Sequence, residues 1–218
     1  MKFQVKNIGL IGYQDGLEFQ EEIHKKVLEK GEDTIILCEH PHVYTFGKSA
    51  DRNNLLISKN FLENIDAEVF ETERGGDITY HGPGQLVGYP IINLRNHGVG
   101  VKKYVEILES SLIKALSQFE IEAFQINGLT GIWVGTENEI KRKIGAIGIR
   151  VKEGVSMHGF ALNVSTNLKY FNHIVPCGIT DKQVTSIERE VGNISIAEFS
   201  KQFILQFEKQ WKNVLALH

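Results

Sequence analysis

Glycine and proline are concentrated in one short segment, and this segment most limits what the chain can fold into. Five of the 21 glycines lie between positions 75 and 88, and Pro83 and Pro90 lie in or beside the same stretch. Glycine lets the backbone turn at positive φ or approach a ligand closely, and proline stiffens a loop. The flanking segments 67–73 and 85–94 have the apolar patterns of strands. The sequence therefore predicts a shaped loop between two strands.

The rest of the chain is predicted to form helices and short strands without strict alternation. Strands are predicted at 2–9, 33–40, 122–126, 131–135, 143–151 and 159–164, and helices at 13–30, 58–64, 101–119 and from 195 onward. Asn127-Gly128 predicts a hairpin turn. We therefore expect a mixed α/β fold, closer to α+β than to a regular parallel sheet. The length of 218 residues fits one large domain or two small ones.

Local signals mark two helix ends. Gly31 is expected to end the first helix. Ser195 followed by Glu198 has the capping-box pattern of a helix start. Apolar residues recur every four positions in that last helix, which indicates core packing. They are Phe199, Phe203, Phe207, Trp211 and Leu215.

Composition places the chain among ordinary globular proteins. Of its 218 residues, 42% are apolar and 23% are charged, which excludes wholesale disorder. Two cysteines cannot make a disulfide scaffold, the N-terminus lacks the apolar core of a signal peptide, and no apolar run is long enough to span a membrane. The net charge of −3 shows no general basic bias. Neither nucleic acid nor a membrane is therefore an expected partner, and we expect a cytoplasmic protein.

Residues 139–153 are a basic exception, with five Lys and Arg side chains against two Glu. Such a segment can attract an acidic partner. It can equally be a solvated edge strand whose lysines oppose aggregation. Charge alone favours the edge strand.

The loop from Arg74 to Gln85, with the sequence RGGDITYHGPGQ, is the densest group of candidate functional residues. Its glycine spacing matches neither the dinucleotide-binding nor the P-loop fingerprint. Arginine, threonine, tyrosine and histidine among glycines can surround a polar substrate group and bring backbone close to it. The alternative is a complex turn whose polar side chains cap backbone groups.

Cys177 is the candidate nucleophile, and it lies between Pro176 and Gly178. A free thiol with a pKa near 8.5 is only about 3% thiolate at neutral pH, and a nearby cation raises that fraction. A buried, unreactive thiol is the alternative, and spacing alone leaves both open. The candidate partners of the thiol are Lys143, His81, His158 and His173.

The other cysteine and several histidines carry weaker signals. Cys38 lies in an apolar run and is expected to be a core thiol. Cys38, His40 and His42 would share one face of a strand, but no second ligand pair follows at a zinc-like spacing, so no metal site is expected. His24 and His97 lie in helix and turn contexts and are expected to be solvated.

With these residues in view, the sequence resembles the LipB-type octanoyltransferases, the lipoyl(octanoyl) transferases of lipoate biosynthesis. The family signature runs Arg-Gly-Gly, two residues, Thr, an aromatic residue, His, two residues, Gly-Gln and then Tyr, and it matches Arg74 through Gln85 and Tyr89 without departure. Further blocks agree in order: EHPHVYTFG (39–47), KIGAIGI (143–149), HGFALNV (158–164) and VPCGI (175–179). The resemblance covers roughly residues 35–185, and it implies a single catalytic domain over 1–218 with its core in roughly 30–218.

The resemblance implies a cysteine–lysine pair. Cys177 matches the nucleophile that carries the acyl group as a thioester, and Lys143 matches the lysine that lowers the pKa of the thiol and transfers protons. The implied fold is the scaffold of biotin and lipoate protein ligases, with a large twisted mixed sheet, flanking helices and a small second sheet. No metal ligand is implied. Positions that match substrate-bordering residues of the family are Arg74, Gly75, Gly76, Asp77, Ile78, Thr79, Tyr80, His81, Ala146, Ile147, Gly148, Gly159, Phe160 and Ala161.

The implied reaction is the first step of endogenous lipoate synthesis. An octanoyl group moves from octanoyl-acyl carrier protein, through a Cys177 thioester, to the ε-amine of a lysine. That lysine lies on a lipoyl domain of a 2-oxoacid dehydrogenase E2 subunit or on the glycine-cleavage H protein. The donor holds the octanoyl group on phosphopantetheine as an activated thioester, so neither ATP nor a metal is an expected cofactor. Because acyl carrier proteins and lipoyl domains are typically acidic, the docking interpretation of 139–153 gains weight. The enzyme is expected to act as a monomer.

Three alternatives remain. An ATP-dependent lipoate–protein ligase would share the fold but need no cysteine, and Cys177 and the lack of a phosphate loop oppose it. A transferase that moves octanoyl groups between lipoyl domains would differ only in its donor. A non-catalytic carrier-protein-binding module would have a degenerate site, whereas every motif residue is present.

Overall fold

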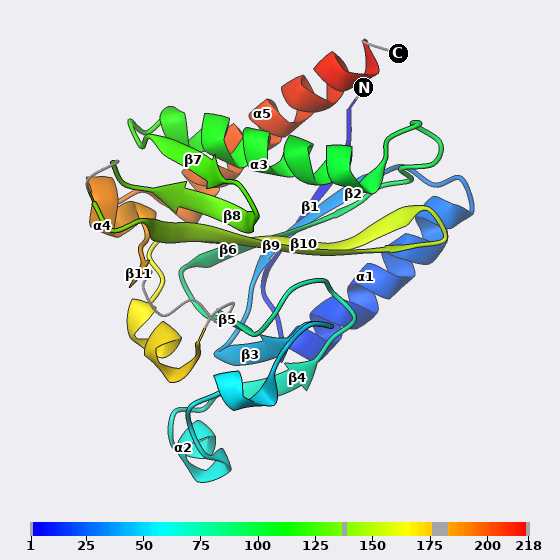
Figure 1. The fold of residues 1–218 in the computed structure, drawn as a ribbon. Coiled ribbons are helices and arrows are strands. Elements are labelled where there is room, and N and C mark those ends of the chain that lie inside the picture. The colour runs from blue at the N-terminus through cyan, green and yellow to red at the C-terminus, as the bar shows by residue number, and fades with distance from the viewer. Residues whose placement is uncertain (1, 137–138, 176–182, 217–218) are drawn as a thin grey trace.

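The computed structural model describes residues 2–136, 139–175 and 183–216. Within these, eight strands form a mixed sheet in the order β1-β2-β6-β10-β9-β8-β7, with β11 paired to β9, and β4-β3-β5 form a second sheet (Figure 1). The strands are β1 (Gln4–Leu10), β2 (Thr34–Glu39), β3 (Val43–Phe46), β4 (Glu68–Glu71), β5 (Thr79–His81), β6 (Gln85–Ile91), β7 (Ala123–Ile126), β8 (Leu129–Val134), β9 (Arg142–Lys152), β10 (Val155–Asn163) and β11 (Gln183–Val184). The helices are α1 (Tyr13–Leu28), α2 (Lys59–Asn64), α3 (Val101–Ser117), α4 (Ile187–Val191) and α5 (Ile196–Leu215), with short 3₁₀ turns at η1 (Arg52–Asn54) and η2 (Leu168–His173).

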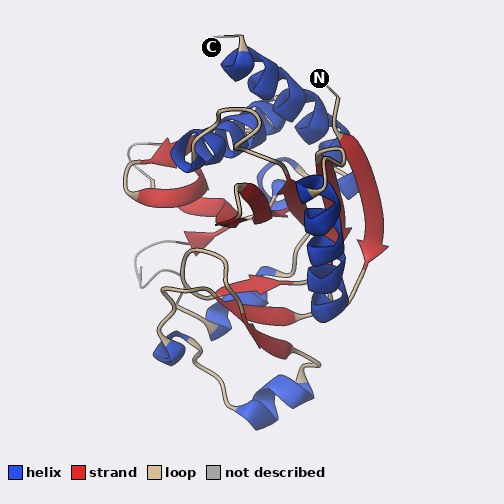
Figure 2. Ribbon diagram, turned by 90° about the vertical axis from the view of Figure 1, so that its right-hand side faces the viewer, coloured by secondary structure: helices blue, strands red, loops and turns tan. Residues whose placement is uncertain are grey.

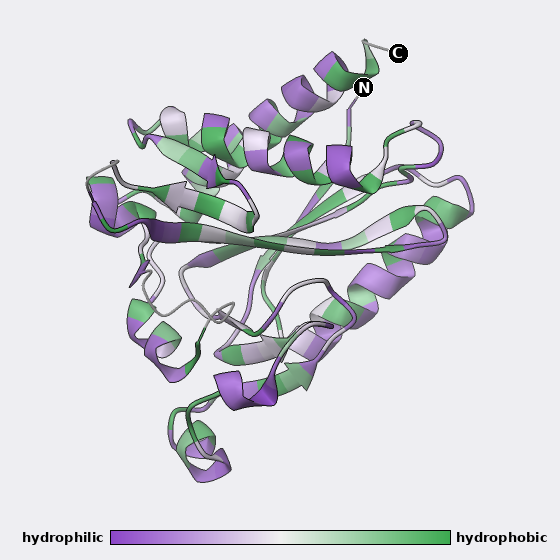
Figure 3. Cartoon of the chain, viewed as in Figure 1, coloured by the Kyte–Doolittle hydropathy of each residue, from purple (hydrophilic) through white to green (hydrophobic). Residues whose placement is uncertain are grey.

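Helices cover both faces of the large sheet, which confirms the expected fold class. The α3 and α5 helices pack together on one face, and α1 packs on the other against β2, β6 and β10. Figure 2 shows the small sheet beside α1, below the large sheet. Figure 3 shows polar residues on the outer sides of the helices. Each helix therefore buries one apolar stripe against the sheet. Among the described residues, no helix is long and apolar enough to cross a membrane.

The last helix follows its sequence signals closely. Ser195 and Glu198 cap each other reciprocally, as the capping-box pattern predicts. The Phe–Trp stripe is at most 1% exposed and Leu215 packs against the same core, so the prediction of core packing is confirmed.

The hairpin of β9 and β10 forms the centre of the large sheet and brings two motif blocks together. Gly148 lies opposite Gly159, Ile147 opposite Phe160 and Ala146 opposite Ala161. The chain reverses at Glu153 and Gly154, which both have positive φ. Two segments separated in the sequence thus form one continuous surface.

Part of the loop from Arg74 to Gln85, called the glycine loop below, rests on this surface. The N–H of Gly75 donates to the carbonyl of Ile149 at 2.9 Å. The loop thus contacts β9 beyond Gly145, where β8 no longer pairs with that strand. A side chain at Gly148 would place its Cβ 2.8 Å from the carbonyl oxygen of Gly75. Glycine is needed at position 148 because the loop backbone comes this close.

Several expectations about single segments are wrong in whole or in part. The edge-strand interpretation of 139–153 holds only for its second half, because β9 pairs with β8 along Arg142–Gly145, whereas residues 146–152 pair, among the described strands, with β10 alone. His24 is 3% exposed with Nε2 3.1 Å from the carbonyl of Lys152, and His97 pairs with Asp33 at 2.5 Å, so neither histidine is fully solvated. Both receive partners from segments distant in the sequence.

The first helix ends one residue earlier than its glycine suggests. Lys30 takes the left-handed position with φ 69°, and the N–H of Gly31 donates to the carbonyl of Lys26 at 2.7 Å. This is the bond of a Schellman motif, in which Gly31 is the second residue past the cap.

Candidate active site

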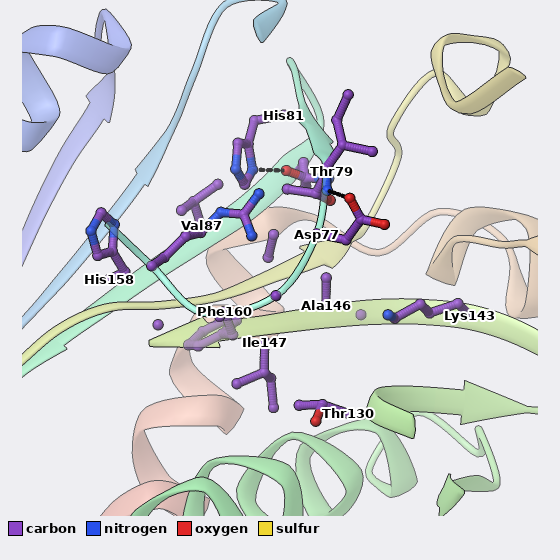
Figure 4. A pocket seen from close by; sticks show the side chains of 18 of the residues that line it. Asp77, Thr79, His81, Val87, Thr130, Lys143, Ala146, Ile147, His158 and Phe160 are labelled. Carbon is purple, nitrogen blue, oxygen red and sulfur yellow. Dashed lines mark hydrogen bonds between the residues drawn. The ribbon is translucent and has the colours of Figure 1, made fainter. Parts of the chain in front are cut away.

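A cavity of about 450 Å³ lies between the β9–β10 hairpin and the glycine loop. This size is within the ~300–1,000 Å³ typical of small-molecule sites. Figure 4 shows Lys143 and Thr130 on one side of it and Val87 and His158 on the other. The glycine loop and β5 contribute Arg74, Gly76, Asp77, Ile78, Thr79 and His81, and the hairpin contributes Lys143, Ala146, Ile147, Gly148, Gly159, Phe160 and Ala161.

Aliphatic and aromatic side chains make up much of the cavity wall, which suits an acyl chain. Phe160 is 3% exposed and packs on Phe203 with ring centres 4.4 Å apart. A side chain at Gly88 would overlap this ring, so glycine at that position gives Phe160 its place. Val87, Ala146 and the other small apolar residues leave the central space open.

Lys143 enters the cavity from β9 over a glycine. Its Nζ lies 5.2 Å from the centre of the Trp133 ring, on the paired residue of β8. A Cβ at Gly131 would lie only 2.5 Å from Lys143 Cε, and Gly131 has a φ of 132°. The buried carboxylate of Glu109 accepts the N–H of Gly131 at 3.3 Å and an amide N–H of Gln125 at 2.9 Å. The β7–β8 hairpin is thereby held where the lysine can pass.

Arg74 braces the loop from within. It is 7% exposed, and its guanidinium donates to the carbonyl of Thr45 at 2.6 Å, to the hydroxyl of Thr45 at 2.9 Å and to the carbonyl of Gly75 at 3.0 Å. The carboxylate of Asp77 accepts from the N–H of Ile78 and the side chain of Asn54, both at 2.7 Å. The two charged side chains therefore shape the loop as well as line the cavity.

His81 is neutral and tied to the loop. Its Nδ1 lies 2.8 Å from Gln85 Oε1. Burial, together with smaller effects of the neighbouring His40 and Arg74, lowers the pKa of His81 to about 3. Gln85 in turn donates to the carbonyl of Tyr80 at 3.1 Å and to Asn163 Oδ1 at 3.0 Å.

His158 has an unusual backbone at the cavity wall. Its φ is 55°, a conformation that a non-glycine residue adopts only at a cost. The side chain of Gln20 on α1 accepts the N–H of His158 at 2.8 Å and so supports this conformation. Burial lowers the pKa of His158 to about 4, assisted by Arg74 and Arg150.

A second polar group lies behind the cavity. His40 Nδ1–H donates to the carbonyl of Ile11 at 2.8 Å, so its Nε2 accepts from the hydroxyl of Tyr89 at 2.7 Å. Cys38 lies 3.6 Å from the same Nε2, is 2% exposed and has its pKa raised by burial. Cys38 is thus the core thiol that was expected. The strand β2 ends at Glu39, so His40 does not extend one strand face as the sequence suggested.

Most of the implied substrate-bordering residues line the cavity, but two do not. Tyr80 is fully buried in a separate apolar cluster with Tyr44, Leu62 and Ile174, called the small core below. Its ring is stacked on Tyr170 with ring centres 5.0 Å apart, and its hydroxyl lies 2.7 Å from His42 Nδ1. Gly75 is engaged with the backbone of β9. Cys177 lies outside the described residues.

Among the candidate partners of the thiol, three of the four line the cavity and one does not. His173 contacts the hydroxyl of Tyr44 at 2.8 Å and is not part of the cavity wall. Sequence reasoning gave no role to Tyr13, Trp133 or Asn163, which do line it. The one sequence signal for Asn163 was its position in the HGFALNV block (158–164), which matches a segment of the family.

The charge of the basic segment is partly balanced in the fold. Arg142 forms a two-point ion pair with Glu190, both distances being 3.0 Å, and Arg150 lies 3.7 Å from Glu73. Its positive surplus is therefore smaller than the sequence alone implies.

Comparison with known proteins identifies the family and the fold of the chain. Residues 12–208 match the family model of the lipoyl protein ligase A/B catalytic domain. The octanoyltransferase of Cytophaga hutchinsonii is 46% identical over 217 residues, covering 93% of this chain and 89% of that protein. Among solved structures, a putative lipoate protein ligase from T. acidophilum with bound lipoic acid has a TM-score of 0.78 at 14% identity, covering 97% of this chain and 87% of that one.

The likeness of fold extends further than the likeness of sequence. Biotin protein ligase from Aquifex aeolicus aligns with a TM-score of 0.56 at 13% identity, over 99% of this chain and 72% of that one. The expected biotin and lipoate ligase scaffold is therefore confirmed. By sequence and by fold, the chain belongs to the lipoyl protein ligase A/B catalytic domain family, among its octanoyltransferase enzymes.

Proposed function

We propose that this enzyme takes an octanoyl group from octanoyl-acyl carrier protein as a thioester on Cys177 and passes it to a lysine ε-amine of a lipoyl domain. The observation that supports this most is the cavity itself. It has an apolar wall for an acyl chain, and Lys143 enters it at one end. The octanoyltransferase relatives support the choice of acyl group.

The reaction needs two exchanges at one carbonyl. The Cys177 thiolate attacks the thioester carbonyl of the donor, and the pantetheine thiol leaves with a proton. The amine of the acceptor lysine then attacks the acyl-enzyme, forms an amide and releases the Cys177 thiol. Because a thioester is already activated and an amide is more stable, the sequence of steps requires neither ATP nor a metal.

Lys143 serves both exchanges. As an ammonium, it favours the thiolate form of a neighbouring thiol. As a neutral amine, it takes the proton that the acceptor amine loses on attack. The space over Gly131 and the Trp133 ring hold its side chain within the cavity.

The thioester is tested by intact mass. Wild-type protein and Cys177→Ser are incubated with octanoyl-acyl carrier protein. An adduct of about 126 Da, on wild type only and removed by hydroxylamine, is the expected mark of acyl transfer to the thiol. Cys177→Ser keeps the size of the side chain and is the matched control.

Two other results would reject the proposal. Transfer without any adduct would favour direct transfer between the substrates. Activity of Cys177→Ser on free octanoate with ATP would favour a ligase. Comparing octanoyl-acyl carrier protein with an octanoylated lipoyl domain as donor identifies the source of the acyl group.

A further inference from the structure

Three buried polar side chains form a row beside the cavity: His81, Gln85 and Asn163, each at most 6% exposed. Asn163 Nδ2 lies 2.9 Å from the carbonyl oxygen of Thr185, and Gln85 Nε2 lies 3.1 Å from the carbonyl oxygen of Tyr80. A backbone carbonyl only accepts hydrogen bonds, so the amide atom that faces it must be nitrogen. Two backbone carbonyls therefore determine the orientation of both amides.

The amide orientations determine where His81 carries its hydrogen. Asn163 Oδ1 accepts from Gln85 Nε2 at 3.0 Å, which leaves Gln85 Oε1 facing His81 Nδ1 at 2.8 Å (Figure 4). Because an amide oxygen only accepts, Nδ1 is the protonated nitrogen and donates. In the neutral ring, Nε2 then holds a lone pair.

His81 lines the cavity, and its Nε2 forms no hydrogen bond with any residue that the structure describes. We propose that Gln85 and Asn163 are positioning residues that lock His81 with its hydrogen on Nδ1, so that Nε2 accepts a hydrogen bond from an N–H group of a substrate. This rests on the proposed function, in which both substrates bring such groups. The donor has the amides of its pantetheine arm, and the acceptor has its lysine amine.

The ring is an acceptor rather than a general base. With its pKa lowered to about 3 by burial, His81 is too weak a base to take a proton at neutral pH. The same row reaches the strand of Lys143, because the N–H of Thr185 donates to the carbonyl of Lys143 at 2.9 Å. The orientation of His81 is thus tied to the strand that carries the lysine.

The tautomer is measured directly by NMR of protein with ¹⁵N-labelled histidine, with the His81 signals assigned by their loss in His81→Asn. The expected spectrum at neutral pH is that of a neutral ring with its hydrogen on Nδ1. A hydrogen on Nε2, or a charged ring, would overturn the proposal. Since this measurement needs no turnover, its failure is distinguishable from failure of the transferase assignment.

Gln85→Glu tests the positioning role at nearly constant size. One carboxylate oxygen still accepts from Nδ1–H, and the negative charge favours a protonated His81, in which Nε2 becomes a donor. The second oxygen replaces Gln85 Nε2 and loses its hydrogen bonds to the carbonyl of Tyr80 and to Asn163 Oδ1. Transfer by Gln85→Glu is therefore expected to fall as pH is lowered, in step with the NMR titration of His81. Wild type is expected to show no step of this kind. A titrating His81 in Gln85→Glu with unchanged transfer would contradict the role of Nε2.

A charge-matched control separates this effect from a general one. Gln118 is exposed at the end of α3, so Gln118→Glu adds the same charge away from the cavity and is expected to change neither readout. The other groups that face His81 stay the same in all three proteins. They are Tyr13, His40, Arg74 and His158.

The two half-reactions identify the N–H group that His81 binds. Acyl-enzyme formation is followed with octanoyl-pantetheine and with a simple alkyl octanoyl thioester that lacks the amides. A loss in Gln85→Glu confined to octanoyl-pantetheine assigns the pantetheine amide. A loss confined to transfer from acyl-enzyme to a lipoyl domain assigns the lysine amine. Wild-type rates in both half-reactions, at a pH where His81 is protonated in the variant, would refute the proposal.

Discussion

Gly131→Ala tests whether Lys143 must lie where the structure places it. The new Cβ would lie 2.5 Å from Lys143 Cε, 3.2 Å from its Nζ and 2.8 Å from the carbonyl oxygen of Gly145. Carbon atoms in contact are about 3.5–4.0 Å apart, so Cε has to retreat by about 1 Å. A displacement of about 1 Å in a positioned group can lower the rate by about 10²-fold.

Backbone strain is a separate cost of the same substitution. Gly131 has a φ of 132°, where alanine is disfavoured, and residues held in such regions cost on the order of 1–3 kcal/mol. Gly128 is the matched control because it belongs to the same β7–β8 hairpin. Its φ is 80°, and a Cβ there would meet nothing within 4 Å. Gly128→Ala therefore adds strain without moving Lys143.

The assay compares octanoyl transfer rates and thermal unfolding of wild type and both variants. We expect both variants to unfold a few degrees earlier, at roughly 2–4 °C per kcal/mol for a chain of this size. Only Gly131→Ala is expected to lose about 100-fold in rate. A folded Gly131→Ala with wild-type turnover would show that the position of Lys143 does not limit the reaction.

Three further outcomes follow from the same geometry. Lys143→Ala is expected to slow transfer and shift its pH–rate profile to the alkaline side, because in the proposed mechanism the Cys177 thiol then loses a neighbouring cation. An unchanged profile would remove Lys143 from the pair. Burial lowers the pKa of His81 to about 3 and of His158 to about 4, from a usual value of 6.5. The folded rings then stay neutral while the unfolded rings take up protons. Each ring therefore lowers the free energy of unfolding by about 1.4 kcal/mol per pH unit as the pH falls from about 6.5 to its folded pKa, and the loss stops there. Urea unfolding of His158→Gln is measured between neutral and mildly acid pH. The free energy of unfolding is expected to fall with decreasing pH less steeply than in wild type, by about 1.4 kcal/mol per pH unit, which corresponds to one proton. An unchanged slope would contradict the buried neutral ring. Phe160→Ala removes the contact with Phe203 and is expected to lower the free energy of unfolding by about 3–5 kcal/mol, measured in denaturant; a loss below about 1 kcal/mol would show that the ring is not part of the packed core.

Features that depend on a few neighbouring residues were predictable from the sequence. The start of α5 follows from Ser195 and Glu198, whose groups cap each other within one turn. The turn at Asn127-Gly128 joins β7 to β8, with Gly128 at positive φ. Such signals act over short range, so tertiary packing had little opportunity to override them.

Strand pairing was not predictable, and the errors come from it. The basic segment 139–153 has the composition of an edge strand, yet β8 covers the second side of β9 along Arg142–Gly145 and leaves residues 146–152 paired, among the described strands, with β10 alone. His24 and His97 have no partner near them in sequence, and the fold supplies Lys152 and Asp33. Hydrogen bonds between distant segments leave no trace in local periodicity.

The sequence by itself determined the family, the mixed fold class and the motif residues around the cavity, because a long signature and short-range spacing carry that information. Only the tertiary structure decided what those residues do. Tyr80 and His81 are adjacent in the motif, yet one supports the small core and the other lines the cavity, because side chains of a strand alternate between its faces. Likewise, Gly131 and Asn163 matter because pairing with β9 and contact with the loop bring them to Lys143 and Gln85.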